Sequence, residues 1–103
     1  MVRLALAALL PLIAAPAWAS SNEAWDQLTR QAQLRCIQAS HFRDAHASQP
    51  IVFSDDSAQV AVLVNGTFPQ RAMNGKTGAN LCLFNRRTGI TQVQEAMGWR
   101  APR

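Results

Sequence analysis

The sequence predicts an α+β fold, in which one N-terminal amphipathic helix packs on a small antiparallel sheet of about four strands, with a single disulfide. The first observation behind this prediction is that the spacing of apolar residues changes near Pro50, from a period of 3.6 to a period of about 2. The second is that the two cysteines, Cys36 and Cys82, lie on either side of that change. No repeat, linker or low-complexity tract divides the chain, so residues 20–103 are expected to form one small domain.

The first nineteen residues have the pattern of an export signal. Arg3 precedes an apolar run from Leu4 to Ala15, and Ala17-Trp18-Ala19 offers small residues at the positions that a signal peptidase reads. The run is too short for the roughly 20 residues of a membrane-spanning helix. We therefore expect residues 1–19 to be removed, and the mature form to have no stable membrane span and to be periplasmic or secreted.

The two cysteines predict a disulfide, because an even number in a small exported domain is typical of a bridge. A Cys36–Cys82 bond would close a loop of about 46 residues, for which loop entropy gives about 4 kcal/mol of stability. A reactive thiol and an intermolecular bridge are the alternatives.

Helical spacing begins at Ser21 and continues to about Phe42. Ser21 or Asn22 can cap the start of the helix, and Leu34 and Ile37 fall outside its apolar stripe. The stripe contains Trp25, Leu28, Ala32, Cys36 and Ala39. Residues 43–50 have the composition of a connector.

Strand patterns follow Pro50. Residues 51–53 are apolar and residues 54–57 are turn formers, which predicts a hairpin. The apolar side chains of residues 58–68 then alternate between two faces, as in a strand. Asn65-Gly66 is a strong hairpin signal that would divide this stretch, but the alternation continues through it, which favours one long strand with a bulge at Gly66.

The remaining chain is expected to form a loop, two strands and a tail. Residues 69–78 are rich in turn formers, and a strand follows from Ala79 to Asn85 or Arg86. Residues 87–89 should turn the chain, with Gly89 in the left-handed conformation, into a last strand over residues 90–95. The tail from about residue 98 is either loose or packed back through Trp99.

A disulfide would decide which face of the sheet meets the helix. Phe84 shares the face of Cys82, whereas Leu81 and Leu83 point to the opposite face, and Leu63 is a candidate to join them. One helix covers only one face, so this second apolar row needs another cover. A homodimer partner, a different protein, the Trp99 segment or curvature of the sheet can each provide it.

The charge balance is modestly basic. The chain has ten Lys and Arg against six Asp and Glu, and removal of Arg3 with the leader would leave a formal net charge of +3. Four cations fall in two loops at opposite ends of the strand that starts at Ala79, namely Arg71, Lys76, Arg86 and Arg87. They are either solvated side chains or a basic rim for an acidic partner. No Tyr and no base-reading motif is present, so nucleic acid is not an expected partner.

Acid–base or metal chemistry has weak support. His41 and His46 are five residues apart and would not share a helix face, so they form a poor metal site. Asp55 and Asp56 fall in a turn, where aspartates commonly bond to nearby backbone N–H groups. Neither a nucleophile elbow nor a zinc-protease motif occurs, so we expect no cofactor and favour a protein that is not an enzyme.

The first functional hypothesis is a small exported binding or accessory module, an inhibitor being one example, that uses the apolar sheet face and the basic loop rims. Its partner would be an envelope or extracellular protein, or a second copy of the chain. One alternative is a structural envelope protein without a single ligand. The other is a small metal-binding protein or hydrolase that uses His41, His46 and Asp55 or Asp56.

Overall fold

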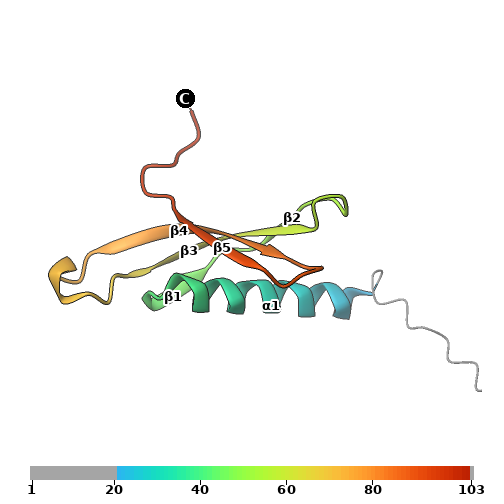
Figure 1. The fold of residues 1–103 in the computed structure, drawn as a ribbon, viewed down its shortest axis with the longest axis horizontal. Helices are drawn as coiled ribbons and strands as arrows, with labels where there is room; N and C mark the ends of the chain where they lie inside the picture. The colour runs from blue at the N-terminus through green and yellow to red at the C-terminus, as the bar shows by residue number, and fades with distance from the viewer. Residues whose placement is uncertain (1–20, 103) are drawn as a thin grey trace, which may run out of the picture.

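A computed structural model describes residues 21–102 and contains one helix packed along one face of an antiparallel sheet (Figure 1). The helix is α1 (Asn22–Ser40). The strands are β1 (Arg43–Ala47), β2 (Ile51–Val52), β3 (Gln59–Thr67), β4 (Thr77–Asn85) and β5 (Thr91–Glu95), with a short 3₁₀ helix, η2 (Arg71–Met73), before β4. The α+β prediction is confirmed. The predicted leader, residues 1–19, lies outside the described residues.

All strand pairs are antiparallel. The sheet order is β1-β3-β4-β5, and β2 pairs with β3 on the same side as β1. The hairpin predicted between residues 51 and 68 is confirmed as β2 and β3. The turn at residues 87–89 also agrees with the prediction, and Gly89 has a φ of 77°.

Helix α1 begins at Ser21, whose side chain accepts a hydrogen bond from the Ala24 N–H at 3.0 Å. It ends at His41, which adopts the left-handed conformation with a φ of 58°. Leu34 is exposed, as its position off the apolar stripe predicts. Ile37 differs from the prediction, because it packs against the core from beside the stripe.

Strand β1 corrects the prediction of a connector over residues 43–50. Its sequence contains no β-branched residue, so local preference gives no strand signal. It forms because the outer edge of β3 needs hydrogen-bond partners. The register shifts between Arg43 and His46, and Asp44 has a φ of 52° at that irregularity.

Asn65-Gly66 lies inside β3 and is not a turn, which confirms the single long strand. The expected bulge at Gly66 is wrong, because β3 and β4 stay in register from Gln59 to Thr67 and the irregularity lies in β1. A Cβ on Gly66 would lie 2.2 Å from the Cβ of Phe42. Glycine is therefore required here by the close approach of Phe42, which stacks edge-on against Phe68 with ring centroids 5.1 Å apart.

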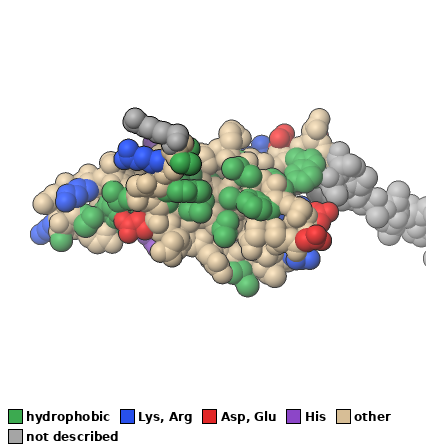
Figure 2. All heavy atoms as spheres, turned by 90° about the horizontal axis from the view of Figure 1, so that it is seen from above, with side chains coloured by type: hydrophobic (Ala, Val, Ile, Leu, Met, Phe, Trp, Pro, Cys, Tyr) green, Lys and Arg blue, Asp and Glu red, His purple; other side chains and the backbone are tan. Residues whose placement is uncertain are grey.

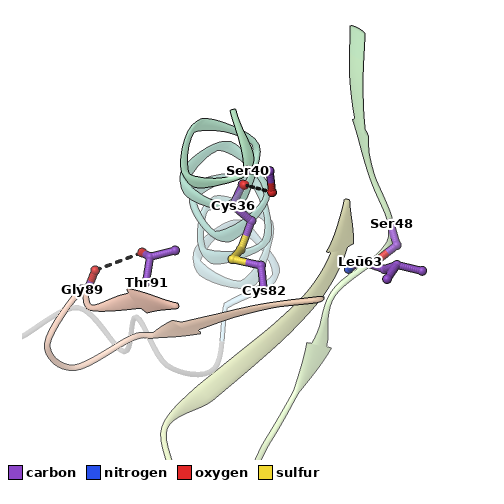
Figure 3. The surroundings of a disulfide bond; sticks show 7 residues. All are labelled: Cys36, Ser40, Ser48, Leu63, Cys82, Gly89 and Thr91. Atoms are coloured by element: carbon purple, nitrogen blue, oxygen red, sulfur yellow. Dashed lines mark hydrogen bonds between the residues drawn. A yellow bond between two sulfur atoms is a disulfide. The ribbon is translucent and has the colours of Figure 1, made fainter. Parts of the chain in front are cut away.

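The core lies between α1 and the facing side of the sheet. Its fully buried members are at most 2% exposed and are Ala32, Cys36, Val60, Val62, Val64, Cys82 and Phe84. Cys36 and Cys82 are joined by a disulfide with their Cα atoms 5.7 Å apart (Figure 3). The disulfide therefore fixes the C-terminal part of α1 over β4, and the predicted assignment of Cys82 and Phe84 to the helix side is confirmed.

Candidate functional site

The sheet face opposite α1 carries the second apolar row, and we call this surface the open face. Leu63 of β3 pairs with Leu81 of β4, and Ala61 pairs with Leu83. Their chain neighbours point toward α1, so side-chain alternation directs these four away from it. All four are only partly buried. The structure thus places Leu63, Leu81 and Leu83 together on one surface.

A hollow of about 420 Å³ lies on the open face. Its lining contains no Lys, Arg, Asp or Glu, and consists of Ser48, Gln49, Ile51, Phe53, Ala61, Leu63, Leu81, Leu83 and Trp99. Three of these side chains keep about half or more of their surface in water, since Ile51 is 66% exposed, Phe53 49% and Trp99 67%. Figure 2, viewed from the side opposite the helix, shows hydrophobic side chains gathered over the middle of the sheet.

The C-terminal segment borders this hollow without closing it. The chain leaves β5 on the side opposite α1 (Figure 1), and the Trp99 N–H donates to the Ala96 carbonyl at 3.1 Å. Trp99 also lines a second hollow of about 420 Å³, together with Leu63 and the start of β4. The side chain therefore separates two hollows. Its high exposure leaves the Leu81 and Leu83 region accessible.

Ser48 fixes one margin of the open face. Its N–H donates to the Leu63 carbonyl at 2.8 Å, and its hydroxyl oxygen accepts from the Leu63 N–H at 2.9 Å (Figure 3). From α1, the Gln33 side-chain amide donates to the Ser48 carbonyl at 2.9 Å. These bonds hold the short segment between β1 and β2 against β3. Ile51 is thereby placed opposite Ala61, on the open face.

The four cations of the expected basic rim lie at the two ends of β4. Arg71 and Lys76 are exposed in the β3–β4 loop, and Figure 2 shows Lys and Arg side chains at that end of the molecule. Arg86 and Arg87 lie in the β4–β5 turn, about 30 Å away along the strand. They are therefore two separate patches.

The Arg86 and Arg87 patch has a structural role. Arg86 forms an ion pair with Asp55, and the Arg87 guanidinium donates to the Asp56 carbonyl at 3.2 Å. These contacts join the β2–β3 turn to the β4–β5 turn. Arg71 and Lys76 have no such contacts, so they are the better candidates for a rim that meets a partner.

The weak metal candidates are not brought together. His41 caps α1, and His46 of β1 pairs with Asn65. The turn that carries Asp55 precedes β3, whose length places it about 20 Å from Asn65. Over residues 21–102 no group of three or more His, Cys, Asp or Glu side chains is arranged to hold a metal ion. Both cysteines of this region are in the disulfide.

Two large apolar members of the hollow, Ile51 and Phe53, were not predicted from the sequence, whereas the Trp99 segment is one of the covers expected for this face. Ile51 and Phe53 belong to a run of three apolar residues, in which alternation is too short to assign a face. The available signal was their hydrophobicity beside turn residues, which does not indicate direction.

No protein-family model, curated protein or solved structure matches this chain. Among residues 21–102, no helix combines the length and the hydropathy that a membrane crossing requires.

Proposed function

We propose that this protein is an exported binding module whose open face docks a protein partner. The observation that carries the proposal is the uncharged hollow, where Ile51, Phe53 and Trp99 keep about half or more of their surface in water around the half-buried Leu81 and Leu83. An exposed apolar patch with a recessed centre is typical of an interaction site.

The distribution of side-chain size supports the same proposal. Apart from Phe84, the buried hydrophobic residues are Val, Ala and Cys. The larger Leu, Ile, Phe and Trp side chains of the open face remain partly or largely exposed. Burying one such side chain fully contributes about 1.5–3 kcal/mol. Because the isolated fold leaves these side chains partly exposed, this free energy is available for binding a partner that covers the face.

The chemistry of the face suggests the kind of partner. Because no charged residue lines the hollow, the inserted group should be an uncharged aliphatic or aromatic side chain. Arg71 and Lys76 lie beyond the hollow at one end, where acidic residues on the partner would accelerate association. Such a partner would be an envelope or extracellular protein, since the disulfide suits an oxidising compartment.

A matched pair of variants tests the proposal. Leu83→Asp places a charge in the hollow, whereas Leu34→Asp places the same charge on the exposed side of α1, where Leu34 is 56% exposed. Both proteins should keep the disulfide and the wild-type circular dichroism spectrum. Each is used as bait for the native envelope and extracellular fractions, and a captured protein is then purified and its affinity is measured.

We expect Leu83→Asp to lower the affinity by at least about tenfold, which corresponds to the loss of one buried apolar contact. Leu34→Asp should bind like the wild type. The proposal fails if no protein binds the wild type, or if both variants bind any captured protein as tightly as the wild type does.

A further inference from the structure

The outer edge of β5 is a second surface at which backbone hydrogen-bonding groups have no partner strand among residues 21–102. β5 is the last strand of the sheet. The Asn85 N–H donates to the Ile90 carbonyl, so even-numbered residues of β5 direct their backbone groups toward β4. The backbone groups of Thr91, Val93 and Glu95 therefore point to the free edge, where no strand of residues 21–102 pairs with them.

The two edges of the sheet differ in how they are protected. The β1 and β2 edge is interrupted by the register shift between Arg43 and His46, by the left-handed Asp44 and by Pro50. Such bulges and prolines prevent a further strand from pairing. β5 has no proline, lysine or irregularity, and its five residues stay in register with β4. Only the β5 edge can therefore extend the sheet.

We infer that a second copy of the chain pairs with this edge, β5 against β5, to form a two-fold symmetric dimer with one continuous sheet. The argument is the self-complementarity of the strand. Antiparallel pairing centred on Val93 joins the outward-facing groups of both copies. Gln92 of one copy then lies opposite Gln94 of the other, and Thr91 lies opposite Glu95. No like charges face each other in this register.

The same register gives a partner to an exposed apolar side chain. Ile90 is 60% exposed at the start of β5. One step beyond the strand, it would lie opposite Ala96 of the other copy, on the open-face side. A partner strand from an unrelated protein would need to supply this match, whereas the chain already contains it.

The helices leave room for the pairing. Cys82 pairs with Val93, so the disulfide that holds α1 lies at the level of the two-fold axis. Three strand spacings separate the two copies of Cys82, which places the helix axes about 14 Å apart there. A helix with its side chains is about 10–12 Å wide, so two helices about 14 Å apart do not overlap. Trp99 lines the open face, so the C-terminal segment also lies over the sheet and away from the free edge.

Two substitutions at one position test the inference. In the dimer, Thr91 of each copy faces Glu95 of the other, so Thr91→Lys should strengthen association and Thr91→Glu should weaken it. With two such pairs in each dimer, we expect each dissociation constant to change by about 2- to 30-fold. Net charge alone predicts the opposite order, because the chain is basic and the glutamate variant is less positive.

The measurement is sedimentation of the full chain, expressed for export with its disulfide formed, from about 1 µM to about 1 mM, a range that covers weak dimers. In parallel, NMR amide exchange should show protection of Thr91, Val93 and Glu95 that rises with concentration. The inference is overturned if the wild type stays monomeric, if the two variants bind alike or in the net-charge order, or if these amides stay unprotected. Neither variant changes Leu81 or Leu83, so this result is separate from that for the open face.

Discussion

Removal of the Cys36–Cys82 bond should destabilise the fold more than any other small change. The bond spans a sequence separation of 46 residues. In the chain-entropy model a loop of this size contributes about 4 kcal/mol at 25 °C. Since small domains have total unfolding free energies of about 5–15 kcal/mol, the reduced protein should lie close to its unfolding threshold. The melting temperature should fall by about 16–30 °C.

Reduction and substitution separate the two roles of the cysteines. Reduction breaks the bond but leaves both sulfur atoms in the core, where Cys36 and Cys82 are 0% exposed. The double variant Cys36→Ala/Cys82→Ala also removes sulfur volume, so it should lose further stability through reduced packing. Urea unfolding followed by far-UV circular dichroism gives the free energy of each form. A loss of less than about 1 kcal/mol on reduction would refute the loop-entropy argument.

Three further substitutions test local features of the backbone. Gly66→Ala should lower the unfolding free energy by about 2 kcal/mol or more, because the new Cβ would lie 2.2 Å from the Cβ of Phe42. Gly75→Ala is the control, because Gly75 has open space around it. It should lower the unfolding free energy by only about 1–2 kcal/mol, the cost of alanine at a positive φ. His41→Gly should raise the stability by up to about 1 kcal/mol, since glycine adopts the left-handed helix end without strain, and equal or lower stability in thermal melts would contradict this.

Most of the fold could be predicted because its signals are local. The Ser21 cap and the stripe through Cys36 define α1, and strict alternation through Asn65 identifies β3 despite its turn-forming dipeptide. β1 could not be predicted, because its residues have no strand preference and pair only to satisfy the edge of β3. The position of Gly66 likewise depends on Phe42, a contact between segments that sequence periodicity does not report.

The part of the candidate site that could be predicted is the part whose orientation follows from the disulfide. Once Cys82 is tied to α1, alternation alone assigns Leu81 and Leu83 to the other face. The margins of the hollow depend instead on the path of irregular chain. The position of Ile51 on the open face depends on the hydrogen bonds between Ser48 and Leu63 of β3, and no sequence pattern indicates those bonds.

The close approach of α1 to the sheet explains why the larger apolar side chains lie on the open face. A disulfide requires Cα atoms within about 7 Å, and here they are 5.7 Å apart. At that distance the innermost row of the helix consists of small residues, Ala32, Cys36 and Ser40 at intervals of four, and the larger Leu28 and Ile37 are only partly buried against the core. Larger residues in this layer would force α1 away from Cys82 and strain the bond. The open face is under no such restriction, so it can carry larger Leu, Ile, Phe and Trp side chains while the disulfide holds the fold.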